Sequence, residues 1–227
     1  MENRQHNLLR LIVESYIETA EPIGSKFLVS EYGLEMSDAT VRNEMRDLEE
    51  VGFLTHPHTS AGRIPTEAGY RFYVQQLLSP RELSKKIRND IEALVNEEDT
   101  DNNHLKQLGK LIAEEMNSAV ILAFGGHDVY YTGLSNLFSQ PEFEDNTQTV
   151  DVSLMFDQCE EIIDAVIQRF PETTPQIFIG TDNPFGDVCS VIGARLPDGR
   201  LVTILGPQRM DYSKGKSIID FIKNYYV

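Results

Sequence analysis

A chain of 227 residues is long enough for one large domain or two modest ones, each with a hydrophobic core of its own. Its formal net charge of −16 argues against a protein that coats nucleic acid without regard to base sequence. No apolar run approaches the roughly 20 residues that span a bilayer, and the sequence opens without a signal peptide, so we expect a cytoplasmic protein.

The first fifty residues predict three helices in succession. Apolar residues recur at helical spacing over residues 3–19, and the proline and glycine that follow end this pattern. A short second helix is expected over residues 25–33, with Phe27 and Leu28 directed inward and a glycine at its end. After a tight connection, residues 37–52 predict the third helix. This order and these lengths are typical of a helix-turn-helix arrangement.

The third helix has two faces of different chemistry. Ser37 or Asp38 can cap its first turn, and Gly52 can take the left-handed conformation that ends a helix. At about 100° per residue, one face is apolar and would pack on a core. This face holds Val41, Met45 and Leu48. A second stripe, turned roughly 140° away, holds Ala39, Arg42, Asn43 and Arg46.

These residue types suit a helix that lies in the major groove of DNA. Arg can pair with guanine and Asn with adenine, while Ala leaves room for close approach. Ser37, Thr40 and Arg46 would then contact phosphate or base. Taken alone, however, such a stripe favours the solvated face of an ordinary surface helix.

A hairpin is expected directly after this helix, with short strands at residues 53–57 and 63–65 around a turn of small residues. A hairpin in this position is the wing of a winged-helix domain. Its tip carries groups that can hold phosphates or enter a minor groove. They are His56, His58, Thr59, Ser60 and Arg63. Two histidines without further ligands do not favour a metal site.

A fourth helix is expected to open at residue 66. Its aromatic side chains are expected to pack against the core, and Arg71, near the wing, to contact phosphate. The charge balance limits how such a domain can bind DNA, because residues 1–80 hold seven Lys and Arg against twelve Asp and Glu. Most of the attraction must come from four arginines, and affinity should be modest. These are Arg42, Arg46, Arg63 and Arg71.

After residue 80 the pattern changes to a mixture of helices and strands. Residues 81–95 predict a linker or dimer helix, residues 97–103 an acidic loop and residues 104–116 another helix. Further helices are expected at 156–170 and around 218–222, and strands at 119–124, 129–132, 176–180, 188–196 and 201–205. The Gly-Gly pair between the first two strands lacks the Lys-Ser/Thr of a phosphate loop and predicts a hairpin turn.

The sequence does not predict an enzyme. Cys159 and Cys189 stand alone, without a CxxC or a metal-ligand spacing. No Ser-His-Asp or Cys-His constellation occurs in a motif context, and the isolated carboxylates are typical of solvated surface. We therefore expect no catalytic residues, no cofactor and no metal.

Residues 37–54 resemble the recognition helix of the heat-inducible transcription repressor HrcA family. The similarity continues without a gap through residues 58–66 and 69–74, and it extends upstream over residues 21–26. Residues 133–143 and 180–222 resemble the regulatory half of that family, a sheet of GAF-like type. Such a long similarity is more specific than a helix-turn-helix pattern, so it favours DNA binding over a solvated helix face.

The resemblance implies an α+β protein in three parts. These are a winged helix-turn-helix DNA-binding domain (1–78), a helical linker with an acidic loop (79–103) and a shortened GAF-like regulatory and dimerisation domain (104–227). It implies a repressor of heat-shock and chaperone genes that binds an inverted-repeat operator as a homodimer, with a chaperonin as a further partner. The expected DNA contacts are Ser37, Thr40, Arg42, Asn43, Arg46, His58, Thr59, Ser60, Arg63 and Arg71.

The chain departs from the family between residues 124 and 129. Family members carry further strands and an inserted dimerisation domain there, whereas residues 125–128 alone connect the two strands of this chain. Other surfaces would then have to form the dimer. Two alternatives remain: a winged-helix module that contacts another protein, and a small-molecule sensor, because GAF-like sheets often carry ligand pockets.

Overall fold

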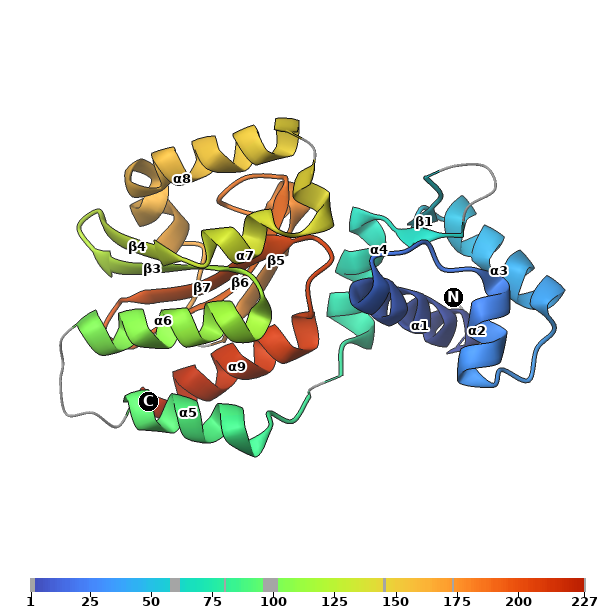
Figure 1. The fold of residues 1–227 in the computed structure, drawn as a ribbon, viewed down its shortest axis with the longest axis horizontal. Coiled ribbons are helices and arrows are strands. Elements are labelled where there is room, and N and C mark those ends of the chain that lie inside the picture. The colour runs from blue at the N-terminus through green and yellow to red at the C-terminus, as the bar shows by residue number, and fades with distance from the viewer. Residues whose placement is uncertain are drawn as a thin grey trace. The chain divides into compact units, whose positions relative to one another are not determined.

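The computed structural model describes residues 3–57, 62–79, 81–95, 102–144, 146–172 and 174–226. It divides into two compact units, Met1–Leu78 and Ser79–Val227, and each unit mixes helices with strands (Figure 1). Within the described ranges, every helix is too short or too polar to span a membrane.

The first unit consists of helices and one small hairpin (Figure 1). Its elements are α1 (Asn3–Thr19), α2 (Ser25–Tyr32), α3 (Asp38–Glu50), β1 (Leu54–Thr55), β2 (Ile64–Pro65), α4 (Glu67–Phe72) and the π-helical segment η1 (Tyr73–Leu77). The two strands pair antiparallel, with Leu54 opposite Pro65. Gly33 and Gly52 have positive φ angles of 58° and 83°, so the predicted helix ends at these residues are confirmed.

The core of the first unit lies between α1 and α3. Their inward side chains are at most 4% exposed, and they are Leu8, Leu9, Ile12, Val13, Val41, Met45 and Leu48. Tyr70 and Tyr73, each 3% exposed, pack into the same unit, as predicted for the aromatic residues of the fourth helix. Burial of these large apolar groups is the main force that holds the helices together.

The inward orientation predicted for Phe27 is wrong. α2 has only eight residues, and its buried stripe is formed by Ser25 and Leu28. Phe27 is turned about 100° away from Leu28 around the helix, and its side chain is 39% exposed. Its ring packs edge-on against Tyr32 instead, with the ring centroids 6.5 Å apart.

The second unit is built on a five-stranded sheet in the order β4-β3-β7-β6-β5, with all neighbours antiparallel. The strands are β3 (Ala119–Gly125), β4 (Asp128–Thr132), β5 (Gln176–Ile179), β6 (Cys189–Arg195) and β7 (Leu201–Pro207). The helices are α5 (Lys85–Val95), α6 (Asn102–Met116), α7 (Leu134–Phe138), α8 (Asn146–Ile167) and α9 (Tyr212–Tyr225), with short 3-10 turns at Pro141–Glu144 and Gly180–Asp182.

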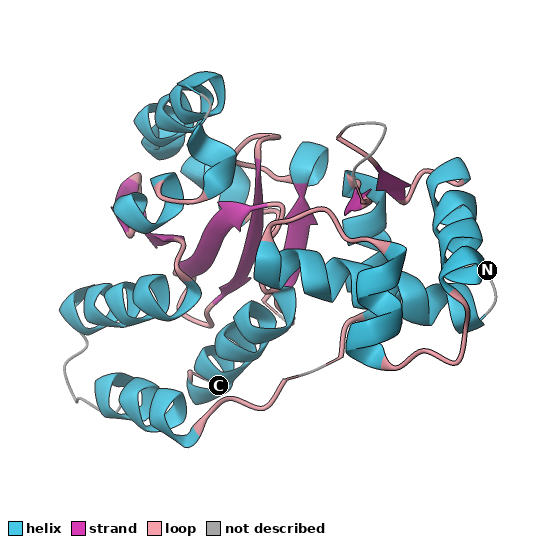
Figure 2. Ribbon diagram, turned by 45° about the vertical axis from the view of Figure 1, so that its right-hand side comes forward, coloured by secondary structure: helices cyan, strands magenta, loops and turns pink. Residues whose placement is uncertain are grey.

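Helices cover both faces of this sheet. α6 and α9 pack on one face, and α8 lies over the other (Figures 1 and 2). Side chains of β3 alternate between the two layers, since Ile121 joins the cluster under α8 whereas Leu122 lies against α6. A Cβ atom at Gly109 of α6 would lie 3.2 Å from the Leu122 side chain, so this glycine allows the helix to approach the sheet closely.

Several segments of the second unit differ from the prediction. α8 begins at Asn146, well before residue 156, because Val152 and Met155 continue its buried stripe upstream. α5 packs against α6 within the second unit rather than standing between the units. Residues 97–101 of the predicted acidic loop lie outside the described residues, and Asn102 already begins α6. The short helix α7 was not predicted.

Candidate nucleic-acid interface

α3 begins with a side-chain cap. The Oγ atom of Ser37 accepts a hydrogen bond from the backbone N–H of Thr40 at 3.1 Å, and the two hydroxyl oxygens lie 2.9 Å apart. This cap satisfies one of the N–H groups that have no partner at a helix start, and such caps stabilise by about 1 kcal/mol. Two of the predicted DNA contacts are therefore held together by the local geometry of the helix start.

The two faces of α3 differ as predicted. The inward residues Val41, Met45 and Leu48 are buried, whereas the opposite stripe is exposed and holds Ala39, Arg42, Asn43 and Arg46. Glu44 is also buried, and its carboxylate pairs with the guanidinium of Arg4 on α1. The pairing compensates the cost of burying the Glu44 charge and fixes α3 to α1.

The two arginines of the exposed stripe each face a carboxylate one helical turn away. Arg42 lies 3.2 Å from Asp38, and Arg46 lies 3.7 Å from Glu50. The arginine side chains are 67% and 63% exposed, and ion pairs this exposed contribute about 0–1 kcal/mol. Both guanidinium groups can therefore leave their partners for a stronger anionic ligand at low cost.

The starts of α2 and α3 are joined by a side-chain hydrogen bond. The hydroxyl of Ser25 donates to the carboxylate of Asp38. Lys26, the second residue of α2, is exposed. No role was predicted for Lys26, and the sequence offered only its position directly after Ser25 as a signal.

A third extended segment adds to the hairpin. Ile23 and Arg63 form an antiparallel bridge, with N–H···O distances of 2.9 and 2.8 Å between their backbones. A Cβ atom at Gly62 would lie 2.5 Å from the Ile23 carbonyl oxygen, so the close approach requires glycine. This bridge holds the base of the hairpin to the segment between α1 and α2.

Glu49, in the last turn of α3, binds the hairpin through its side chain. Its Oε2 atom accepts a hydrogen bond from Nε of Arg63 at 2.8 Å, and its Oε1 atom pairs with Nδ1 of His56. Arg63 is only 23% exposed in this arrangement. Glu49 was missed in the sequence, because it lies 14 residues from Arg63 and no local pattern connects them.

Thr66 connects the end of α3 to the start of α4. Its hydroxyl donates to the carbonyl oxygen of Gly52 at 2.6 Å and accepts from the backbone N–H of Gly69 at 3.1 Å. Arg71, one turn further along α4, pairs with Glu67 and is 30% exposed. The predicted phosphate contact is therefore half-buried and already bound to a carboxylate.

The remaining predicted contacts at the hairpin tip, His58, Thr59 and Ser60, lie outside the described residues. In the described part, α3 and the hairpin base bring together Ser37, Thr40, Arg42, Asn43 and Arg46 on one helix, and Arg63 at its far end. Arg71 lies on the next helix.

The cysteines of the second unit are free and buried. Burial, with a smaller contribution from Glu160, raises the pKa of Cys159 to about 11, and burial with Glu142 raises the pKa of Cys189 to about 12. Both thiols therefore remain protonated at neutral pH and are poor nucleophiles. Across the described ranges, no group of three or more His, Cys, Asp or Glu residues is placed to hold a metal ion.

Comparison with known protein families assigns the greater part of the chain. The family described as HrcA protein C terminal domain matches residues 68–215. The chain belongs to the HrcA family. The matched segment begins within α4 and ends within α9, so it covers most of the second unit and the end of the first.

Relatives of known name extend the similarity. The heat-inducible transcription repressor HrcA of Acetivibrio thermocellus is 46% identical over 117 residues, which cover 52% of this chain and 32% of that protein. The protein of the same name from Desulforudis audaxviator is 56% identical over 80 residues, which cover 35% of this chain and 23% of that protein. The names are those of repressors rather than enzymes, and the chain matches only about a third or less of their length.

A solved structure shares the fold of this HrcA family member. The crystal structure of a hypothetical protein superposes with a TM-score of 0.76, covering 100% of this chain and 98% of that one. Its sequence identity is 16%, so the similarity concerns the fold alone.

Proposed function

We propose that this chain is a sequence-specific, DNA-binding transcriptional repressor. In this proposal residues 1–78 form a winged helix-turn-helix domain, and the second unit is a GAF-like regulatory domain. The observation that carries it is the exposed stripe of α3, which presents Arg42, Asn43 and Arg46 to solvent while the opposite face is buried. A helix with this division of faces is the element that winged-helix proteins place in the major groove.

Different residues along α3 are assigned to different parts of the DNA. Arg42 and Asn43 are assigned to base edges, because both side chains can make two-pronged hydrogen bonds to purines. Ser37, Thr40 and Arg46 are assigned to phosphates or bases on either side. The ion pairs of Arg42 and Arg46 with Asp38 and Glu50 are exposed and weak, so exchange for DNA costs little.

The hairpin and α4 are assigned to the DNA backbone. Arg63, Arg71 and the tip residues His58, Thr59 and Ser60 would contact phosphate and fix the register of α3. The hydrogen bond to Glu49 occupies Nε of Arg63 and leaves its Nη groups able to donate to phosphate, but the Glu49 carboxylate compensates the positive charge of Arg63. This compensation, with the net charge of −16, predicts modest affinity that falls as the salt concentration rises.

The genes and partners follow from the named relatives. Because these relatives are heat-inducible transcription repressors, we assign the chain to heat-shock genes. A homodimer would place one α3 in each half of an inverted-repeat operator, since the symmetry of the site mirrors that of the protein. The proposal includes a cytoplasmic location, because a repressor must reach the chromosome. The chaperonin partner stays a prediction.

Selection from random-sequence DNA tests the proposal. Duplexes enriched by the purified chain are compared with scrambled duplexes by fluorescence anisotropy. Arg42→Ala should weaken binding to the enriched duplex by about 1–3 kcal/mol and relax the base preference. Arg10→Ala is the matched control, because Arg10 also pairs with a carboxylate one turn away, Glu14 at 3.0 Å, but lies on α1.

Two results would contradict the proposal. One is a selection that enriches no sequence. The other is an equal loss of affinity for enriched and scrambled duplexes in Arg42→Ala, which would remove that residue from base recognition.

A protein contact is the second candidate function of the first unit. The exposed aromatic pair Phe27 and Tyr32 on α2, each 39% exposed, favours it, because aromatic side chains are enriched in protein interfaces. Phe27→Ala distinguishes the candidates. It should leave DNA affinity unchanged if α3 is the functional surface, whereas a protein contact through α2 would be lost.

A further inference from the structure

A cavity of about 230 Å³ lies in the second unit, between α8 and the segment that leads into β6. One wall is formed by α8 residues between Asp151 and Gln158, and the other by residues 185–189. The residues that line the cavity include no proposed DNA contact and no residue of the first unit. The cavity is therefore a feature that the proposed function leaves unexplained.

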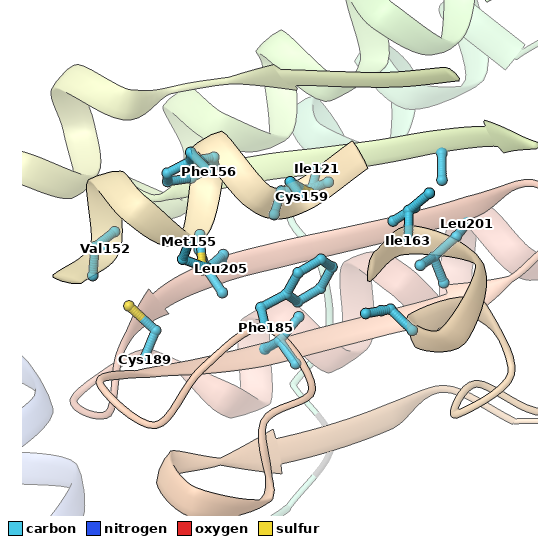
Figure 3. Packing of buried hydrophobic residues seen from close by; sticks show 14 of the residues in the cluster. Ile121, Val152, Met155, Phe156, Cys159, Ile163, Phe185, Cys189, Leu201 and Leu205 are labelled. Atoms are coloured by element: carbon cyan, nitrogen blue, oxygen red, sulfur yellow. The ribbon is translucent and has the colours of Figure 1, made fainter. Parts of the chain in front are cut away.

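The interior of the cavity is mainly apolar. Met155 of α8 and the facing Phe185 and Cys189 are each at most 8% exposed and line it (Figure 3). Val152, Leu154 and Val188 add further aliphatic surface. Since the pKa of Cys189 is raised to about 12, its thiol contributes a neutral, polarisable atom and no charge.

The size of the cavity limits what it can hold. Drug-sized ligands occupy pockets of about 300–1,000 Å³, whereas an apolar cavity of about 150 Å³ is enough for benzene. A volume of about 230 Å³ therefore accommodates one aromatic ring with a short substituent. A folded peptide segment or a lipid tail is too large for it.

The polar groups at the cavity are acidic. Asp151 and Asp187 line it and are exposed, and no Lys, Arg or His is among the lining residues. In the described part of the chain, neither carboxylate has an ion-pair partner. The nearby Arg209 is bound to Glu142, with Nε and Oε1 2.6 Å apart, so its charge is compensated. An incoming cation would thus meet two unpaired carboxylates, and an anion would be repelled.

We propose that this cavity is a binding site for a small organic amine that carries one aromatic ring or a group of similar size. The apolar walls would enclose the ring, and the ammonium group would lie between Asp151 and Asp187 at the mouth. This proposal is independent of DNA binding, and its test needs no DNA.

Methionine NMR on the full chain tests the site. The chain has six methionines, and Met155 lies in the cavity wall, so a ¹³C-methyl-methionine sample provides a reporter that Met155→Leu assigns. The probes are 2-phenylethylamine and the anionic 3-phenylpropanoate, which have similar size and opposite charge. The amine should shift the Met155 signal saturably, with a dissociation constant of about 1 mM or below. The methyl signal of Met45, in the first unit, should not move.

Two pairs of variants locate the binding. Leu154 and Val150 lie one turn apart on α8 and are 51% and 55% exposed, but only Leu154 lines the cavity. Leu154→Trp should weaken binding of the amine about tenfold, whereas Val150→Trp should change it less than about twofold. Asp187→Asn should weaken it about threefold, whereas Asp157→Asn, an exposed change elsewhere on α8, should not.

Different results would overturn the site and the ligand class. No saturable Met155 shift in a chain with a native spectrum overturns the site, and so does an equal effect of Leu154→Trp and Val150→Trp. Binding of 3-phenylpropanoate as tight as that of the amine overturns the ligand class. Loss of DNA binding in Arg42→Ala leaves all of these measurements unchanged, so the two proposals fail independently.

Discussion

Oε2 of Glu49, in the last turn of α3, accepts a hydrogen bond from Nε of Arg63 in the hairpin at 2.8 Å. Each side chain is 23% exposed, so the pair is partly shielded from solvent. The backbone of Arg63 also bridges to Ile23. One arginine thus fixes the end of the proposed recognition helix, the hairpin and the segment before α2 to one another. The carboxylate of Glu49 also compensates the positive charge of Arg63, which is one of the few cations proposed to contact DNA.

Glu49→Gln removes the negative charge but keeps a hydrogen-bond acceptor for Arg63. We expect it to destabilise the first unit by about 1 kcal/mol, because a charge-assisted bond becomes a neutral one. Affinity for any duplex should rise by up to about fivefold, the effect of one charge a few ångströms from a phosphate in water. Urea unfolding and anisotropy measure the two effects. Glu18→Gln, an exposed change on α1, is the control, and unchanged DNA affinity in Glu49→Gln would contradict this account.

Ser37 has two roles that can be separated. Ser37→Ala removes the cap of α3 and should cost about 1 kcal/mol of stability. Ser37→Asp keeps an acceptor for the Thr40 N–H, so its stability should be close to that of the native chain, while the added charge repels phosphate. We therefore expect Ser37→Asp to fold normally and to bind DNA at least about tenfold more weakly. Equal DNA affinity in the native chain and Ser37→Asp would remove Ser37 from the interface.

Two glycines of the first unit should respond differently to alanine. A Cβ atom at Gly69 would lie 2.2 Å from the backbone oxygen of Phe53, whereas one at Gly24 meets nothing within 4 Å. Gly69→Ala should therefore cost about 3 kcal/mol, because either α4 or the hairpin must move. Gly24→Ala should lower the free energy of unfolding by less than about 1 kcal/mol, because alanine is a poorer N-cap residue than glycine. Thermal unfolding of the two variants measures the difference, and similar melting temperatures would disprove the close contact.

The local features of the first unit could be predicted because each depends on residues close in sequence. The start of α3 depends on Ser37 and Thr40, its buried face on the spacing of Val41 and Met45, and its end on Gly52. Phe27 was mistaken for a core residue because an eight-residue helix has room for only one buried stripe. The start of α8 was missed because its first turn is polar, and Val152 and Met155 alone continue its buried stripe before residue 156.

The contacts that shape the candidate interface could not be predicted in this way. Ser25 binds Asp38 across 13 positions, and Glu49 binds Arg63 across 14. Such pairs form only when the helices have packed, so their partners cannot be chosen by spacing. The cavity beside α8 has the same origin, since Met155 and Phe185 meet only through the fold. Sequence patterns therefore identify the exposed stripe of α3 but not the side-chain contacts that join α3 to α2 and to the hairpin.

His127, in the turn between β3 and β4, predicts a pH dependence. A hydrogen bond with the Glu160 carbonyl oxygen, 2.7 Å from Nδ1, and Asp164, 3.7 Å from Nε2, raise its pKa above the usual value. Protonation of His127 therefore favours the folded state. Its contribution to folding stability is fully present below the ordinary pKa of about 6.5 and is lost as the pH rises through the raised pKa of the folded state. An NMR titration should show the raised pKa, and Asp164→Asn should lower it only in part, because the Glu160 carbonyl remains. A pKa at or below the usual value in the folded chain would contradict these contacts.

Arg71 should contribute affinity without contributing specificity. It lies on α4, away from the exposed stripe of α3, and its guanidinium pairs with Glu67. A cation that contacts only phosphate attracts every duplex alike and releases about one counterion. We therefore expect Arg71→Ala to weaken binding to enriched and scrambled duplexes by the same factor and to reduce the slope of log affinity against log salt by about one. Arg42→Ala, which should change the ratio between the two duplexes, is the comparison. If Arg71→Ala instead altered that ratio, the residue would read base sequence, and α4 would have to lie closer to the groove than this proposal places it.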